Sequence, residues 1–210
     1  SSTDKHLWLF GYGSLIWKPP PHYDRRLPGY IHGYVRRFWQ VYHRGTPHHP
    51  GRVVTLIASP PSPAQDPLPR VWGAAYRIPA AHAVAARAHL DHREINGYSV
   101  QTALFHLRDE VDGDGDGDGK GAAREETSIE CLVYVGLPTN PQFLGPQEPQ
   151  ALAERISRCR GPSGANVEYL YRLHEALAAV GGGDDDDDHV ADLVRRCREL
   201  DARESADCPA

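Results

Sequence analysis

The chain has 210 residues, 40% of them hydrophobic, and a formal net charge of −5. This length suits one domain with a substantial core. The acidic balance, without a basic stripe of interleaved aromatic residues, argues against a nucleic-acid partner. Every apolar run is much shorter than the roughly 20 residues that cross a bilayer. We therefore expect a soluble, cytoplasmic protein with neither nucleic acid nor membrane as a partner.

Strand-like segments dominate the first half of the chain, separated by connections rich in proline. The opening run Leu7-Trp8-Leu9-Phe10 is typical of a buried strand. Other segments carry β-branched and aromatic residues in alternation, which predicts further strands. These strands are predicted over residues 30–42, 52–57, 71–78, 99–107 and 129–135.

Helical patterns follow. Pro79 precedes an alanine-rich stretch, which predicts a helix over 80–91. Three more helices are predicted in the second half, over residues 149–159, 163–180 and 189–203. Strands first and helices last indicate an α+β domain. We predict a single domain over residues 1–210.

Two segments are low in complexity. Residues 112–121 alternate Asp with Gly, and residues 181–188 are three glycines followed by five aspartates. Such composition buries little apolar surface, so both are expected to be mobile, solvated loops. Asp114, Asp116 and Asp118 match the spacing of a calcium loop. We nevertheless expect no calcium, because strands rather than helices are predicted on both sides.

Cysteine and histidine patterns carry no metal or redox signature. Cys131, Cys159, Cys197 and Cys208 form no Cys-x-x-Cys pair, so free thiols are predicted. The twelve histidines include no His-Glu-x-x-His motif, and surface or partly buried roles suit them better than a metal site. We expect no metal.

The turn after the first strand, Gly11-Tyr12-Gly13-Ser14-Leu15, is a candidate anion site. Two glycines let the backbone turn tightly with its N–H groups unobstructed, and such a nest can bind a carboxylate, a phosphate or a developing oxyanion. The turn lacks the third glycine of a dinucleotide-binding motif, and Ser14 does not stand in Gly-x-Ser-x-Gly. A glycine turn that merely ends a core strand explains these residues equally well.

Glu94 is the carboxylate in the most suggestive position. It lies just after a predicted helix and beside the Asn96-Gly97 turn that leads into a strand. A carboxylate at such a junction can face a pocket, and partial burial would raise its pKa toward that of a general base. An ion pair with Arg93 or another surface arginine is the simpler alternative.

The run from Phe10 to Pro19, Phe-Gly-Tyr-Gly-Ser-Leu-Ile-Trp-Lys-Pro, resembles the opening motif of the ChaC-like, glutathione-specific γ-glutamylcyclotransferases. Further motifs of that family recur in the family's order, and the resemblance covers about residues 7–178. These motifs lie at residues 36–40, 43–47, 50–56, 71–77, 90–98, 140–141, 144–146, 161–164 and 166–170. The segment between Gln40 and His43 is shorter than in relatives, and the aspartate-rich segments are not family features.

The resemblance implies a mixed α/β fold built around a small β-barrel, with C-terminal helices. It implies that Glu94 is catalytic and that the turn holds the γ-glutamyl group. The substrate-binding residues expected on this basis are Phe10, Gly11, Tyr12, Gly13, Ser14 and Leu15. Arg44, Arg52 and Tyr98 are further candidates, since arginine can bind a carboxylate with two hydrogen bonds; structural ion pairs and packing are their alternative roles.

The implied reaction is glutathione cleavage. The α-amine of the γ-glutamyl group attacks its own γ-carbonyl, forming 5-oxoproline and releasing Cys-Gly, and this chemistry requires no cofactor. Two alternatives remain open: a cyclotransferase for other γ-glutamyl amino acids or amines, and a non-catalytic module that binds a small anion.

Overall fold

A computed structural model describes residues 6–42, 44–46, 48–59, 68–93, 98–108, 128–182 and 187–206. The described strands are β1 Leu7–Gly11, β2 Arg25–His32, β3 Tyr34–Tyr42, β4 Gly51–Ala58, β5 Arg70–Ile78, β6 Tyr98–Leu107, β7 Ser128–Gly136, β8 Arg160–Gly161 and β9 Gly164–Ala165. The helices are η1 Ser14–Ile16, α1 Ala80–Arg93, α2 Pro149–Arg158, α3 Asn166–Val180 and α4 Asp188–Ala206.

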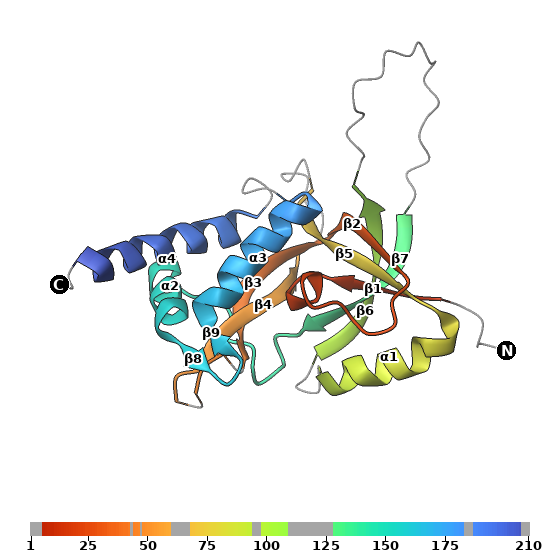
Figure 1. Ribbon diagram of the computed structural model, residues 1–210, viewed down its shortest axis with the longest axis horizontal. Coiled ribbons are helices and arrows are strands. Elements are labelled where there is room, and N and C mark those ends of the chain that lie inside the picture. Colours follow the sequence, from red (N-terminus) through yellow and green to blue (C-terminus); the bar gives the residue numbers. More distant parts are fainter. Residues whose placement is uncertain are drawn as a thin grey trace, which may run out of the picture.

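The centre of the fold is a closed barrel of five strands in the order β1-β5-β2-β6-β7 (Figure 1). β1 pairs antiparallel with β5 along its whole length. A parallel pairing of β1 with β7, at Leu9 and Leu132, closes the barrel. Closure covers the backbone edges that an open sheet would expose. It also fixes the end of β1, and therefore the glycine turn that follows, at one end of the barrel.

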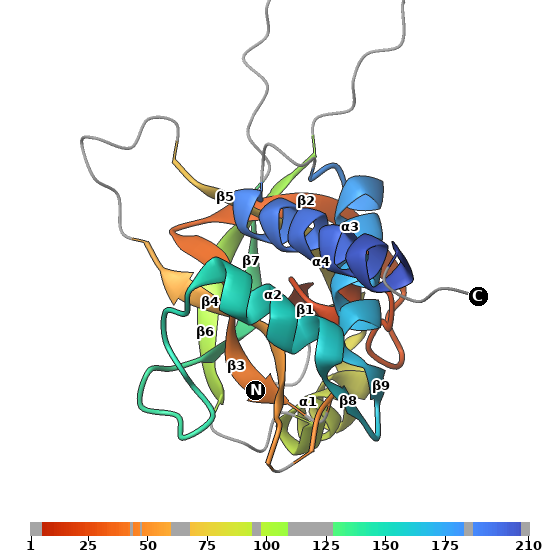
Figure 2. The same cartoon turned by 90° about the vertical axis from the view of Figure 1, so that its left-hand side faces the viewer.

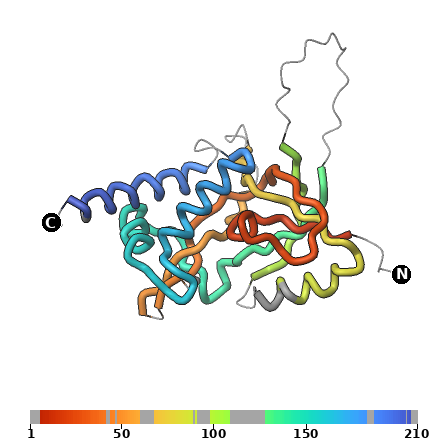
Figure 3. Tube along the Cα trace, viewed as in Figure 1, coloured from red at the N-terminus to blue at the C-terminus, as the bar shows by residue number. Residues whose placement is uncertain are grey.

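The β3–β4 hairpin lies beside the barrel, and the C-terminal helices α2, α3 and α4 gather around it (Figures 1 and 2). Its two strands shift register between Arg37 and Gln40, which is the irregularity of a β-bulge. Residues of the barrel, the hairpin and these three helices form one buried hydrophobic cluster. Helix α1 lies apart from them, and Leu90 of α1 packs with Leu9 and Tyr134 in a smaller cluster. Figure 3 shows the same separation along the Cα trace.

Local sequence explains the limits of two helices. Glu148 accepts hydrogen bonds from the backbone N–H groups of Gln150 and Ala151, and Pro149 occupies the first turn of α2. An acceptor before the first turn and proline within it are both favourable for a helix start. Helix α3 ends at Gly181, whose φ of 105° is in the left-handed region that glycine adopts readily.

Several predicted element boundaries are wrong. β2 begins at Arg25, five residues before the predicted start at residue 30, and α4 continues to Ala206, three residues beyond its predicted end. The single strand predicted over 30–42 is two strands, because Gly33 has a φ of 83° and breaks the extended chain between β2 and β3. Helix α3 begins at Asn166 rather than at Ser163, since Gly164–Ala165 forms strand β9 and pairs with β8.

The prediction of a solvated loop over 181–188 is wrong at both described ends. Gly182 is buried, and a Cβ there would lie 2.8 Å from Cβ of Trp72, so the backbone packs against that ring system. Asp187 forms an ion pair with the buried Arg36. The composition hid these contacts because they depend on residues far away in the sequence.

The predicted fold class is confirmed: the chain has a mixed α+β fold with a closed five-stranded barrel and C-terminal helices. Cys131, Cys159 and Cys197 are free and buried, as expected. Of the described helices, none is both long and apolar enough to span a bilayer. The aspartate–glycine segment 112–121, with its calcium-loop spacing, and Cys208 lie outside the described residues.

Candidate active site

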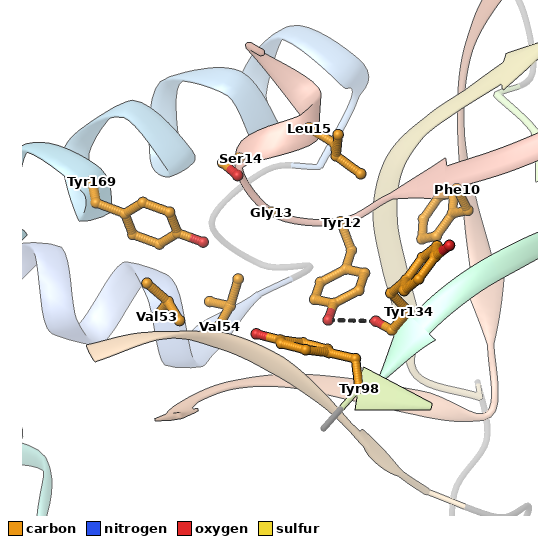
Figure 4. A pocket seen from close by; sticks show the side chains of 10 residues that line it. All are labelled: Phe10, Tyr12, Gly13, Ser14, Leu15, Val53, Val54, Tyr98, Tyr134 and Tyr169. Atoms are coloured by element: carbon orange, nitrogen blue, oxygen red, sulfur yellow. Dashed lines mark hydrogen bonds between the residues drawn. The ribbon is translucent and has the colours of Figure 1, made fainter. Parts of the chain in front are cut away.

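The glycine turn opens into a cavity at the junction of the barrel, the hairpin and helix α3 (Figure 4). The space measures about 560 Å³ with its open mouth included. Its described lining consists of Phe10, Tyr12, Gly13, Ser14, Leu15, Val53, Val54, Tyr98, Tyr134 and Tyr169. None of these described lining residues carries a formal charge. Among the described lining residues, hydroxyl and backbone groups are therefore the ones that can supply polar contacts to a ligand.

The turn itself is held rigidly by main-chain hydrogen bonds. The N–H of Ile16 donates to the Gly13 carbonyl at 3.0 Å, and the N–H of Trp17 donates to the Ser14 carbonyl at 3.3 Å. These bonds produce the 3₁₀ turn η1. A Cβ at Gly11 would lie 2.6 Å from Cβ of Leu15, so only glycine permits this close return of the chain.

Tyr76 of β5 supports the turn through its side-chain hydroxyl. Its hydroxyl donates to the Leu15 carbonyl at 2.7 Å, and the Arg26 guanidinium donates to the same hydroxyl oxygen at 3.3 Å. Burial raises the pKa of Tyr76, and the nearby Arg26 opposes that shift. The raised pKa keeps the phenol protonated, so Tyr76 remains a donor to the turn at neutral pH.

Four tyrosines shape the cavity wall. The Tyr12 hydroxyl donates to the Tyr134 carbonyl at 2.7 Å, which ties the glycine turn to strand β7. In Figure 4 the hydroxyl ends of Tyr98 and Tyr169 point toward the middle of the cavity. A tyrosine presents a rigid apolar ring with one hydrogen-bonding end. The wall can therefore pack against a flexible substrate and also orient its polar groups.

Tyr169 is the most firmly supported of these rings. Its ring centroid lies 5.3 Å from that of Trp17 and 5.9 Å from that of Phe38, both in edge-on geometry. The Arg44 guanidinium carbon lies 5.4 Å from the same centroid. A Cβ on Gly13 would stand 3.1 Å from the Tyr169 hydroxyl oxygen, so the hydroxyl closely faces the turn.

Neither Arg44 nor Arg52, both predicted to bind substrate, is among the described residues that line this cavity. Arg44 is buried behind Tyr169 and donates from Nη1 to the Ala165 carbonyl at 2.8 Å. Arg52 donates from Nη1 to the Pro50 carbonyl at 2.7 Å, and burial lowers the pKa of its guanidinium. Both side chains bond to backbone carbonyl groups beside the cavity, and their substrate-binding roles remain predictions.

Asn166, the first residue of α3, fastens that helix to the hairpin. Its Oδ1 accepts from the Arg52 backbone N–H at 2.6 Å, and its Nδ2 donates to the Arg52 carbonyl at 2.7 Å. The Asn166 side chain is completely buried. Tyr169 is three residues further along α3. The two hydrogen bonds of Asn166 therefore also set where Tyr169 enters the cavity.

The other predicted residues divide into three groups. Phe10, Tyr12, Gly13, Ser14, Leu15 and Tyr98 are brought together around the cavity. Gly11 is absent from the described lining and serves the turn behind it, paired with Ala74 of β5. Glu94 lies outside the described residues, in the four-residue connection between α1 and β6. Binding and catalytic roles for these residues remain predictions.

The sequence analysis assigned no role to four lining residues, Val53, Val54, Tyr134 and Tyr169. Three of them stand inside family-like motifs, in the segments 50–56 and 166–170. Their place in those motifs was the available signal. Tyr134 had no such signal, because its role follows from the pairing of β7 with β6 and β1.

Burial raises the pKa of Cys131 to about 12, so its thiol is protonated and unreactive at neutral pH. Among the described residues, no three His, Cys, Asp or Glu side chains gather as a metal site would require.

The fold and the cavity together define a barrel protein with an uncharged, tyrosine-walled site for a small molecule. The family model described as "ChaC-like protein" matches residues 7–200, so the chain belongs to the ChaC-like family.

Curated relatives agree with this membership. The chain is 41% identical over 189 residues to the glutathione-specific γ-glutamylcyclotransferase of Schizosaccharomyces pombe, covering 84% of this chain and 85% of the relative. It is 37% identical over 192 residues to the human glutathione-specific γ-glutamylcyclotransferase 1, covering 90% and 77% of the two chains. A crystal structure of a glutathione-specific γ-glutamyl cyclotransferase from yeast superposes with a TM-score of 0.79 at 34% identity, covering 93% of this chain and 97% of that one.

Proposed function

We propose that this protein degrades glutathione by cyclising its γ-glutamyl group, giving 5-oxoproline and Cys-Gly. The observation that carries the proposal is the cavity, where a glycine turn of the family's opening motif faces Tyr98 and Tyr169 in a chain related to glutathione-specific enzymes. The described wall of hydroxyl and apolar groups can hold a flexible γ-glutamyl substrate in one orientation, and an intramolecular attack depends on such orientation rather than on an added reactant. Alignment of such groups is worth up to about 7–11 kcal/mol.

The chemistry needs a base, which we assign to Glu94. An α-amine with a pKa near 8 is mostly protonated at pH 7, and it attacks only after losing its proton. Glu94 precedes Tyr98 by four residues, so the two Cα atoms are at most about 14 Å apart, within reach of one bound substrate. The carboxylate takes the amine proton and returns it to the departing nitrogen of Cys-Gly.

The glycine turn completes the mechanism. As the amine attacks, the γ-carbonyl oxygen gains negative charge, and backbone N–H groups of residues 11–15 stabilise it. Loss of one such donor typically costs about 3–4 kcal/mol in the transition state. The turn also supplies donors for the α-carboxylate of the glutamyl group.

Net charge and cysteine state support the expected partners and location of the protein. The net charge of −5 supports the absence of a nucleic-acid partner. Three free, buried cysteines support a reducing, cytoplasmic location.

The test is incubation of the purified protein with reduced glutathione, with 5-oxoproline and Cys-Gly measured by mass spectrometry. The wild type should form both products, and Glu94→Gln, which preserves size and hydrogen-bonding capacity, should form neither while unfolding at a similar temperature. Product from Glu94→Gln would remove Glu94 from the base role. Reaction with γ-glutamyl dipeptides but not with glutathione would overturn the substrate, and no reaction with either would favour a binding module.

A further inference from the structure

Arg36 of β3 is the largest of the fully buried side chains, although it carries a charge. Among the described residues, its guanidinium has partners on three different parts of the chain. Nε donates to the Tyr12 carbonyl at 2.9 Å, Nη1 donates to Oδ2 of Asp187 at 2.5 Å, and Nη2 donates to the Trp72 carbonyl. A buried charge is costly unless it is paired and fully hydrogen-bonded, so this arrangement needs an explanation beyond packing.

The bond to Tyr12 has a geometric consequence for the glycine turn. The Tyr12 carbonyl and the Gly13 N–H belong to one planar, trans peptide unit, in which the two groups point in opposite directions. Arg36 therefore fixes both groups when it binds the carbonyl. The Tyr12 side chain is also fixed, through its hydroxyl bond to the Tyr134 carbonyl. The rotation of the Tyr12–Gly13 peptide is thus set by Arg36 on one side and restrained by β7 on the other.

Asp187 in turn orients Arg36. Only 13% of the Asp187 side chain is exposed, and its second oxygen, Oδ1, accepts from the backbone N–H of Val190 at 3.2 Å. Its carbonyl accepts from the N–H of Ala191 at 3.1 Å. A carboxylate with both oxygens engaged can hold a guanidinium in one orientation. The beginning of α4 is therefore joined, through Arg36, to the cavity turn.

A second bond keeps α4 in this place. The Phe38 backbone N–H donates to Nε2 of His189 at 3.1 Å, two residues from Arg36 on β3 and two from Asp187. Neither Arg36 nor Asp187 belongs to the described lining of the cavity. Any effect on a ligand must therefore pass through the Tyr12–Gly13 peptide.

We propose that Arg36 and Asp187 are positioning residues for the reaction, which hold the Tyr12–Gly13 peptide so that the Gly13 N–H is directed into the cavity as an oxyanion donor. The inference rests on the proposed function for its catalytic meaning. It assigns the start of the C-terminal helix a part in the site, although that helix contributes no lining residue among those described.

The discriminating variant is Asp187→Asn. Asparagine caps a helix about as well as aspartate, so the bond to the Val190 N–H is retained, whereas the charge opposite Arg36 is lost. Val190→Ala is the matched control, because it weakens the packing of the same helical turn without touching Arg36. Arg36→Lys is the second variant: it keeps the charge but cannot bond in three fixed directions.

Two readouts are needed. For glutathione, kcat/KM of Asp187→Asn should fall by about 10- to 100-fold with most of the loss in kcat, because a misdirected donor weakens mainly the transition state. For Arg36→Lys, kcat/KM should fall at least as far. For Val190→Ala, kcat/KM should stay within about twofold of the wild-type value when the two proteins are compared at the same folded fraction. Conformational exchange of the Gly13 amide, measured by NMR relaxation dispersion, should appear in the first two variants only.

The inference is overturned if Asp187→Asn keeps the wild-type kcat and shows no conformational exchange at Gly13, or if Val190→Ala changes both as much. It is likewise overturned if neither Asp187→Asn nor Arg36→Lys folds, since the pair would then be purely structural. If the wild type releases no product from glutathione, the proposed function fails. The exchange measurement still decides whether the pair positions the turn.

Discussion

The double hydrogen bond between Asn166 and the Arg52 backbone allows the sharpest stability prediction. Asn166→Ala leaves the Arg52 N–H and carbonyl without their partner in a completely buried place. Each orphaned buried group costs about 1–3 kcal/mol, so the free energy of unfolding should fall by roughly 4 kcal/mol. In a chain of this size the melting temperature should fall by about 8–16 °C.

Urea unfolding followed by tryptophan fluorescence measures this change. Val167→Ala is the control, because it shortens the neighbouring, partly buried side chain at the same end of α3 and removes no hydrogen bond. The control should lose only about 1 kcal/mol. A loss below about 1 kcal/mol for Asn166→Ala, or equal losses in the two variants, would refute the view that this bond fastens α3 to the hairpin.

Two further predictions concern the cavity and pH. Gly13→Ala places a methyl group 3.1 Å from both the Tyr169 hydroxyl and Cγ2 of Val54, so kcat/KM for glutathione should fall by about 10- to 200-fold, with partial recovery in the double variant with Val54→Ala. Wild-type kinetics in Gly13→Ala would contradict this. Burial lowers the pKa of His189 from 6.5 to about 4, with Arg37 adding to that shift and Asp187 and Asp192 opposing it. Between pH 6.5 and pH 4, His189 therefore gains a proton in the unfolded state but not in the folded state. The wild type should lose roughly 3 kcal/mol of its free energy of unfolding as the pH falls through this range. His189→Gln should lack this loss in urea titrations at each pH, and parallel curves would disprove the assignment.

The parts of the fold that sequence predicted were those with a strong local signal. Three elements are recognisable from a few consecutive residues: the apolar run ending at Phe10, the alanine-rich helix after Pro79 and the glycine turn. The structure has them where they were predicted. The boundary at Gly33 was missed because a single glycine inside a strand-like run is compatible with both a strand and a break.

The sequence predicted the glycine turn of the candidate site but only part of the cavity wall. Residues 10–15 are contiguous, so one motif reveals them together. Tyr134 and Tyr169 reach the cavity from β7 and α3, and nothing local marks them as its wall. The pairing of Arg36 with Asp187 could not be predicted for the same reason, since the two residues are 151 positions apart in sequence. Asp187 was further hidden in a run of aspartates that composition alone reads as solvent-exposed.

The parallel pairing that closes the barrel can form only late in the synthesis of the chain. Leu9 of β1 meets Leu132 of β7, so a further 123 residues (132 − 9) must be made after Leu9 before the pair can form. At about 5–20 residues per second, β1 waits roughly 6–25 s on the ribosome for that partner. During this interval an apolar strand, Leu-Trp-Leu-Phe, lacks the neighbour that will protect its edge. The strand that leads into the glycine turn is therefore open to aggregation while the protein is being made.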